Sequence, residues 1–543
     1  MRGLVACYEP PAVDIGRRIF ALGGNVADVA IAASYAQVVS NPFMCGLSGK
    51  ASIHVRDAGR KEEVILDAGH IIGSRAYPTV FQDLYIDRWE KVGRFRVKGD
   101  VNSVGYRAIM SPGFVPATQR LYERFGSGRL SWKTLLEPAV QLAWEGFGVY
   151  PQIAQFWDED YIIVMGTQIN LRKKLSICPE GMKLLYHPDG TRYKIGELLV
   201  QRDLACTIRR IAEEGPEVFY KGEIARRVAA DFDANGAFVT YEDMANYPVD
   251  IREPIRITYR DYVLTANPPP GNGMIALIML NILEGYDLAR MDPLSPEYAE
   301  TLARAQQCAF DDRGKYRGDP RFVEVPLDML ISKEHASEWR QKIAAGQVPT
   351  KSAPATEYGT THVTVMDADG NTVTMTHSIG SAAGSGVVTE GFGFFHNNHM
   401  GLFDPVPGSV DTIVPGKRQG GSVPIIVFKD GEPVLAIGAA GGTRQVSGAV
   451  QSIIHVLDHG MSMSAAVSCP RLHSEEPDLI LMESGWPEST QAALRAKGFR
   501  IQPAQMLGWV NGITREPKTR ELKGGSEIRG SRGHGILGYY SSE

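Results

Sequence analysis

The 543-residue chain has few cysteines and no long apolar run. Its six cysteines are scattered, with no CxxC pair and no spacing that combines them with histidines. We therefore expect neither a disulfide framework nor a zinc site. The longest apolar stretch, residues 274–283, is too short to cross a bilayer, and the N-terminus lacks the apolar segment of a signal peptide. These absences predict a cytoplasmic protein with no membrane partner, no metal and no other cofactor.

An excess of positive charge is also lacking. The chain has 57 Lys and Arg against 62 Asp and Glu, a net charge of −5. Without a basic excess to neutralise a phosphate backbone, nucleic acid is not an expected partner. Hydrophobic residues make up 43% and charged residues 22%, which is typical of globular proteins and excludes collagen-like, disordered and coiled-coil classes.

Periodicity and turn residues predict the main elements. Small residues at helical spacing indicate a buried helix over 26–39, and most of 75–345 has a helical pattern. Further helices are expected over 135–146, 201–214 and 274–283. Hairpins are expected from 52–56 with 64–67, from 362–366 with 372–378, and from 424–428 with 433–437. The polar residues 346–359, which show no periodicity, are the clearest linker.

The start of the 362–378 hairpin is the most informative point of the chain. Asp369-Gly370 is a strong turn signal. With these two as the turn residues, Thr361 would face Ser378, and Thr360 would lie diagonal to it. A second hydroxyl would then stand beside Thr360, able to orient it by hydrogen bonding.

Thr360 follows Gly359 directly, at the end of the linker. If the bond between them is cut, Thr360 carries a hydroxyl and a free α-amine, whose ordinary pKa is about 8. That amine could act as general base for its own hydroxyl. Gly359 has no β-carbon, so its backbone could adopt the geometry that self-attack requires. The alternative is that Thr360-Thr361 is simply strand-forming sequence.

A second candidate feature follows the last predicted strand. Gly441-Gly442 precedes a helical pattern, so its backbone N–H groups could stabilise an oxyanion; the alternative is a close-packed turn. Other motifs are weaker. The segment 46–50 lacks the leading glycine of a phosphate loop, no GxSxG is present, and His396 and His399 have no third metal ligand in view.

Taken together, these motifs resemble the γ-glutamyltransferase (glutathione hydrolase) family of N-terminal-nucleophile hydrolases. The resemblance runs nearly end to end. Its motifs are Gly23-Gly24-Asn25, Glu137-Pro138-Ala139, Gly215-Pro216, Phe219-Tyr220-Lys221-Gly222, Pro268-Pro269-Pro270, Asp312-Arg313, Gly318-Asp319-Pro320, Thr360-Thr361-His362, Asp369-Gly370-Asn371, Asn397-Asn398, Gly441-Gly442 and Pro470-Arg471.

The resemblance implies an α+β fold, a four-layer αββα sandwich, made as a precursor. Self-cleavage would give a large piece, 1–359, and a small piece, 360–543, which stay together as a heterodimer or a dimer of heterodimers. Thr360 would be the nucleophile both for self-cleavage and for attack on a small-molecule amide. Water or an amine would then resolve the acyl-enzyme. Ser378 would support the nucleophile, and Gly441 and Gly442 would form the oxyanion hole.

The chain departs from the family in the residues that hold a γ-glutamyl group. Gly69 stands at the arginine position, Gly380 at the asparagine position, His399 at the glutamine position, Leu402 at the aspartate position, and Gly420-Gly421 at the serine pair. A substrate charge left unpaired in a buried site is costly. We therefore expect a non-classical amide substrate, with His70, Arg75, His399 and Arg418 as candidate binding residues. The alternatives are a true γ-glutamyl enzyme with a rearranged pocket, and a non-catalytic binding protein on this scaffold.

Overall fold

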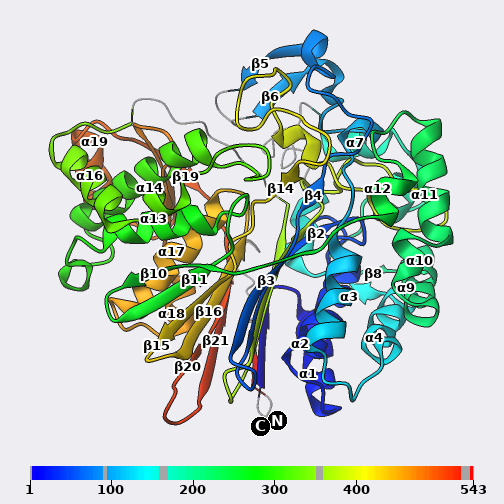
Figure 1. Cartoon of the computed structure of the whole chain (residues 1–543), viewed down its shortest axis with the longest axis horizontal. Coiled ribbons are helices and arrows are strands. Elements are labelled where there is room, and N and C mark those ends of the chain that lie inside the picture. Colours follow the sequence, from blue (N-terminus) through cyan, green and yellow to red (C-terminus); the bar gives the residue numbers. More distant parts are fainter. Residues whose placement is uncertain (1–2, 90–93, 158–168, 350–358, 528–538, 542–543) are drawn as a thin grey trace.

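The computed structural model describes residues 3–89, 94–157, 169–349, 359–527 and 539–541, arranged in four layers. Two antiparallel sheets face each other in the centre, and helices cover the outer face of each (Figure 1). The predicted αββα sandwich is confirmed.

The first sheet joins strands from the beginning, the middle and the end of the chain. Its order is β22 (Tyr539–Ser541), β1 (Gly3–Cys7), β12 (Thr361–Asp367), β13 (Thr372–Ser378), β2 (Lys50–Asp57), β3 (Glu62–Ala68) and β9 (Asp250–Arg252). The strands that follow Thr360 are therefore flanked on both sides by strands from the first 70 residues.

The second sheet has six strands. Its order is β10 (Ile255–Tyr259), β11 (Tyr262–Ala266), β15 (Ile425–Lys429), β16 (Glu432–Ala440), β20 (Trp509–Arg515) and β21 (Leu522–Ser526). The β10–β11 hairpin lies within the mainly helical region 75–345 and was not predicted. Only β10 alternates exposed and buried residues, whereas β11 ends in three consecutive buried residues, so the period-2 pattern is weak.

Two groups of helices cover the sheets. The first sheet is covered by α1 (Pro10–Ala21), α2 (Val26–Ser40), α3 (Phe114–Phe125) and α4 (Trp132–Glu145). The second is covered by α13 (Gly273–Leu283), α14 (Pro296–Tyr316), α17 (Arg444–Leu457) and α18 (Met463–Ser468). A large apolar cluster fills each helix–sheet interface. Within the described residues, no helix is both long enough and apolar enough to cross a bilayer.

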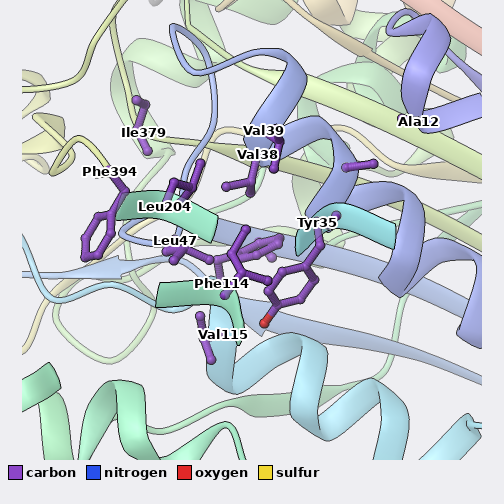
Figure 2. Packing of buried hydrophobic residues seen from close by; sticks show 14 of the residues in the cluster. Ala12, Tyr35, Val38, Val39, Leu47, Phe114, Val115, Leu204, Ile379 and Phe394 are labelled. Atoms are coloured by element: carbon purple, nitrogen blue, oxygen red, sulfur yellow. The ribbon is translucent and has the colours of Figure 1, made fainter. Parts of the chain in front are cut away.

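Helix α2 is the centre of the first of these clusters. Asn25 begins it with a capping box, accepting from the Ala27 and Asp28 backbone N–H groups. All fifteen of its residues are buried, as its many small side chains predict, because they allow close approach on every face. Tyr35, Val38 and Val39 point into the core that Phe114 completes (Figure 2).

The remaining elements are short or peripheral. The helices are α5 (Pro151–Ala154), α7 (Leu171–Leu175), α8 (Pro179–Leu185), α9 (Arg202–Glu214), α10 (Glu217–Tyr220), α11 (Glu223–Ala234), α12 (Tyr241–Ala245), α15 (Leu327–Leu330), α16 (Lys333–Ala344) and α19 (Glu488–Ala496). The strands are β4 (His70–Ile71) with β14 (Arg418–Gln419), β5 (Tyr85–Trp89) with β6 (Arg94–Val97), β7 (Phe147–Gly148) with β8 (Leu198–Leu199), and β17 (Leu472–His473), β18 (Leu479–Glu483) and β19 (Arg500–Ala504).

Most of the predicted helices and hairpins are present within a few residues of their expected bounds. The predicted linker is only partly observable, since residues 350–358 lie outside the described residues.

Between the two sheets lies a polar network rather than a purely apolar core. His362 is hydrogen-bonded through Nδ1 to Thr376 Oγ1 at 2.8 Å, and through Nε2 to the hydroxyls of Thr364 and Thr374, both at 2.9 Å. All four side chains are buried. A satisfied buried network of this kind fixes the strands in one register, because a slip would leave its members without partners.

His362 of the first sheet lies directly against Gly438 of the second sheet. A β-carbon at Gly438 would overlap the imidazole ring. We expect Gly438→Ala to destabilise the protein by about 1–3 kcal/mol, because the ring and its threonines would have to move. Gly59→Ala is the matched control, since a β-carbon there meets only the Asp57 carboxylate at 3.4 Å. Thermal melts should show a lower Tm for Gly438→Ala alone; equal melting temperatures would contradict this packing.

Candidate active site

The β12–β13 hairpin differs from expectation by one residue. The observed turn has three residues, because Asp367 N–H donates to Asn371 O at 3.0 Å and Gly370 takes the positive φ of 87° that ends such a loop. Thr361 therefore pairs with His377, not with Ser378. The predicted register is wrong, and the correction places Thr360 directly opposite Ser378 rather than diagonal to it.

Thr360 lies at the head of β12, with its side chain against that of Ser378. The two hydroxyl oxygens are 3.3 Å apart. Both hydroxyls donate short hydrogen bonds to the carbonyl oxygen of Gly359, and Ser378 Oγ accepts from the Gly380 N–H at 3.0 Å. Thr360 is only 5% exposed. Two hydroxyls thus converge on the carbonyl of the peptide bond that the sequence marks for cleavage.

Gly359 is required at its position by packing. A β-carbon there would overlap the carbonyl oxygen of Gly380. This is a more specific reason for glycine than the conformational freedom inferred from the sequence. Any side chain at 359 would push the scissile carbonyl away from the hydroxyls of Thr360 and Ser378.

Glu9 is a site residue that the sequence analysis missed. Its carboxylate accepts hydrogen bonds from Thr361 Oγ1 at 2.5 Å, Gln37 Nε2 at 2.6 Å and Asn41 Nδ2 at 2.8 Å. Burial raises its pKa, and these three hydrogen bonds oppose the increase. Glu9 therefore ties the residue after Thr360 to the first two helices. The partners lie 28 to 352 residues away in sequence, so no local pattern identifies it.

Gly441 and Gly442 lie at the same end of the sandwich as Thr360. Strand β16 follows β12 along the interface between the sheets. Ala436 shares an apolar cluster with Met366 of β12, and Gly438 lies against His362, which is nearer the start of β12. At its last residue, Ala440 pairs with Trp509, whose ring packs on Tyr8, the neighbour of Glu9, at 5.6 Å.

The glycine pair has the backbone of a tight strand-to-helix turn. Gly441 and Gly442 have φ of 120° and 64°, and α17 begins at Arg444. Backbone N–H groups at the N-terminus of a 14-residue helix are well suited to stabilise an anion. The geometry is compatible with an oxyanion hole, which remains a prediction.

The structure brings together two of the four candidate binding residues. The rings of His70 and His399 lie 4.4 Å apart, and His70 Nε2 is hydrogen-bonded to Ser48 O at 3.1 Å. Burial, with the neighbouring His399 and the positive charge of Lys50, lowers the pKa of His70 well below its ordinary value. His70 is therefore neutral at pH 7 and can recognise a substrate only as a hydrogen-bonding or stacking group.

The two candidate arginines are already engaged elsewhere. Arg75 is about half exposed and forms an ion pair with Asp233. Arg418 is buried, donates to the backbone oxygens of Asp67 and Pro248, and lies 3.1 Å from Asp250 Oδ2. Binding a substrate carboxylate through Arg418 would require these contacts to be exchanged.

Three of the positions at which the chain departs from the family have no room for a side chain. A β-carbon at Gly69 would overlap Gln419 O, one at Gly380 would overlap Asn398 Oδ1, and one at Gly420 would overlap the Pro270 backbone. Atoms of neighbouring residues therefore fill the space that a side chain would need at these positions. A small cavity with internal room for about one water molecule lies beside Gly420; its lining also includes Leu402 and Gln419.

No cluster of three or more His, Cys, Asp or Glu side chains that could hold a metal ion occurs among the described residues. His396, singled out by its spacing from His399, is hydrogen-bonded to the hydroxyls of Thr389 at 3.0 Å and Ser48 at 3.1 Å.

The family resemblance is decided by comparison with known proteins. The sequence profile of the gamma-glutamyltranspeptidase family matches residues 12–536. The chain belongs to this family. The predicted membership is therefore confirmed, and with it the assignment as an N-terminal-nucleophile hydrolase.

Relatives within the gamma-glutamyltranspeptidase family carry two kinds of name. An acylase ACY 1 proenzyme of Pseudomonas sp. (strain V22) is 34% identical, covering 95% of this chain and 90% of its own. A glutathione hydrolase proenzyme of Bacillus subtilis (strain 168) is 31% identical over 96% and 89% of the two chains. The crystal structure of a cephalosporin acylase from Bacillus halodurans superposes with a TM-score of 0.84 at 28% identity, covering 99% and 95%.

The burial of His362 leads to a prediction about how the stability of the protein depends on pH. Burial lowers the pKa of His362 to about 3, from an ordinary value near 6.5. Between these values the unfolded chain binds a proton that the folded chain does not, so stability decreases as the pH falls from about 6.5 toward 3. We expect His362→Gln to be less stable at pH 7, because its threonine contacts change, but to lose stability less steeply on acidification.

Urea unfolding midpoints measured from pH 7 to pH 4 test this expectation. The control is Thr374→Val, because it also removes a contact of His362 but keeps the buried imidazole, so its slope should equal that of the wild type. An identical slope in the wild type and in His362→Gln would show that His362 is not a buried neutral group.

Proposed function

We propose that the protein is a self-processing amide hydrolase whose acyl-enzyme forms on Thr360, and that its substrate is not a standard γ-glutamyl amide. The observation that carries the proposal is the convergence of the Thr360 and Ser378 hydroxyls on the Gly359 carbonyl oxygen. Relatives named as proenzymes, over nine-tenths of this chain, support processing.

In self-cleavage, Thr360 Oγ1 attacks the carbonyl carbon of Gly359, and the bond from that carbon to the Thr360 nitrogen breaks. The hydroxyl proton passes to the departing nitrogen, leaving an ester. Water then hydrolyses the ester to a Gly359 carboxylate and a free threonine. Ser378 polarises the carbonyl by donating to its oxygen, where negative charge develops. The products are chains 1–359 and 360–543.

The same hydroxyl then serves in turnover. The new α-amine takes the Thr360 hydroxyl proton while the oxygen attacks a substrate amide, and the proton passes on to the leaving amine. Water or an amine acceptor resolves the resulting ester and restores the threonine. Gly441 and Gly442 are proposed to donate to the oxyanion, as their place at the N-terminus of α17 supports.

The site disfavours a substrate that carries both an α-carboxylate and an α-amine. Gly69, Gly380 and Gly420 have no side chain and no room for one, and Leu402 offers the cavity an apolar group. Charges brought to these positions would be desolvated without direct partners there. The name acylase among the relatives supports an amide of a different acyl group.

Thr360→Ala should abolish both self-cleavage and turnover, because the variant lacks the attacking hydroxyl. On a denaturing gel the wild type should run as bands of about 39 and about 20 kDa, which divide 59.4 kDa in the ratio of 359 to 184 residues. Thr360→Ala should remain a single band. Thr360→Ser should cleave more slowly.

Thr361→Ser is the matched control for Thr360→Ser, since it keeps the hydroxyl that donates to Glu9 and leaves the nucleophile intact. Cleavage of Thr360→Ala at the 359–360 bond would rule out the assigned nucleophile. A wild type that persists uncut would favour a non-catalytic binding protein.

The substrate assignment is tested with nitroanilides. We expect the processed enzyme to release nitroaniline from simple acyl anilides with a kcat/KM at least about tenfold higher than from the γ-glutamyl anilide, because an unpaired buried charge costs at least about 1.4 kcal/mol. Efficient turnover of the γ-glutamyl compound would instead identify a γ-glutamyl enzyme with a rearranged pocket.

A further inference from the structure

We infer that Glu9 is a positioning residue for the nucleophile: it holds Thr361 from the helix-covered face of the sheet, and its negative charge keeps the new α-amine of Thr360 basic. This inference rests on the proposed function and concerns how its site is controlled. Glu9 is not itself a catalytic residue, because its carboxylate contacts the Thr361 hydroxyl rather than a reacting atom.

The helix that Glu9 begins does not use its side chain. Glu9 is the N-cap of α1, where a carboxylate usually accepts a hydrogen bond from the second or third N–H of the helix. It makes no such bond, because Pro10 and Pro11 have no N–H and the Ala12 N–H donates to the backbone oxygen of Glu9 at 3.1 Å. The carboxylate instead contacts β12.

Neutral donors hold this carboxylate in a fully buried place. Thr361 Oγ1 and Asn41 Nδ2 donate to its Oε1, and Gln37 Nε2 donates to its Oε2. A set of three donors fits the ionised form, which accepts at both oxygens. Burying a carboxylate is costly even when it is hydrogen-bonded. Since α1 gains no cap from Glu9, we attribute the retained charge to its contact with β12.

Gln37 completes a clamp on Thr361. Its Nε2 lies 3.0 Å from Thr361 Oγ1 and 3.3 Å from His362 O, and its Oε1 accepts from His377 Nε2 at 2.9 Å. Thr361 and His377 are paired in the sheet. The clamp therefore holds both strands at the residue after Thr360. A displacement of Thr361 would move the Thr360 hydroxyl away from the scissile carbonyl.

The other titratable groups around the Glu9 carboxylate are neutral at pH 7, so Glu9 supplies the charge of this cluster. These groups are Cys7, Tyr8, Cys45, Tyr150 and His377. Burial raises the pKa of the two thiols and of the Tyr150 phenol, and it lowers the pKa of His377 to about 3. The Tyr8 hydroxyl donates to a backbone oxygen at 3.1 Å.

The carboxylate is near enough to the future α-amine to act on it. From the 2.5 Å contact with Thr361 Oγ1, standard bond lengths place the Thr360 nitrogen within about 10 Å of Glu9. A negative charge at that distance stabilises the ammonium form. Lys50 on β2 and Arg444 at the start of α17 carry positive charges that act in the opposite direction. Those two charges are the same in every variant below.

The rate of self-cleavage of the freshly synthesised chain, followed on denaturing gels, tests the clamp. Glu9→Gln and Thr361→Val should each slow cleavage at least about tenfold, as for loss of a buried hydrogen bond to a charged group. Thr361→Ser keeps the hydroxyl and should stay within about threefold of the wild type. Tyr150→Phe is the matched control, because it removes a buried hydroxyl near Glu9, which donates to Ser40 O at 2.9 Å, but keeps the carboxylate. It should cleave at the wild-type rate.

The dependence of kcat/KM on pH, measured for the cleaved enzyme with a simple acyl anilide, tests the charge. In Glu9→Gln the midpoint of the acid limb should fall by about 0.5 to 1 pH unit, because the ammonium form of the base loses a stabilising charge. Tyr150→Phe and Thr361→Val retain the carboxylate and should keep the wild-type midpoint. A purely structural loss would lower kcat without moving the midpoint.

Failure of the inference is distinguishable from failure of the proposed function. Unchanged cleavage in Glu9→Gln and Thr361→Val, or an unchanged midpoint in Glu9→Gln, would overturn the inference while the wild type still cuts itself and turns over. A wild type that persists uncut would refute the proposed function and the inference with it.

Two further outcomes are also decisive. If the wild type cuts itself but hydrolyses none of the anilides, the proposed substrate is wrong, and the cleavage rates alone decide the role of Glu9. If Glu9→Gln does not fold, which circular dichroism would reveal, Thr361→Val and Thr361→Ser decide it. Equal cleavage rates in those two variants would overturn the inference.

Discussion

The proposed chemistry depends on the pairing of β12 with β13, which places Thr360 beside Ser378. One hairpin brings a residue that follows the linker to the position opposite Ser378, so that two hydroxyls meet on a single carbonyl. The three-residue turn at Gly370 sets that register. A register shifted by one residue would turn the Thr360 side chain toward the helices. The proposed chemistry at Thr360 thus depends on the conformation of a turn that lies eight or more residues further along the chain.

The layer between the sheets reinforces this register. Threonine hydroxyls and the His362 ring occupy part of this layer, beside a small apolar cluster from both sheets, and each of these polar groups has a partner there. At one end of the same face lie Thr360 and Ser378, both buried. The polar face of the first sheet therefore continues from a structural network into the candidate site. On the opposite face, the sheet packs against the apolar side chains of α2 and α3.

Much of this arrangement could be predicted from sequence, because its signals are local. Small residues identified α2, Asp-Gly marked two hairpins, and the Gly359-Thr360 junction marked the proposed nucleophile. The turn length was not predictable from Asp369-Gly370, because the same dipeptide fits both a two-residue and a three-residue loop. Glu9 was missed because its partners come from distant segments.

The interleaving of β1, β12, β13 and β2 has a consequence for the life of the folded protein. The sheet takes strands from both sides of residue 360, so neither of the two proposed products contains the whole sheet. After the proposed cleavage, refolding from heat or denaturant would require two separate chains to meet, while their unpaired strand edges could pair with other chains. The persistence of the cleaved form would then depend on how slowly it unfolds rather than on its ability to refold.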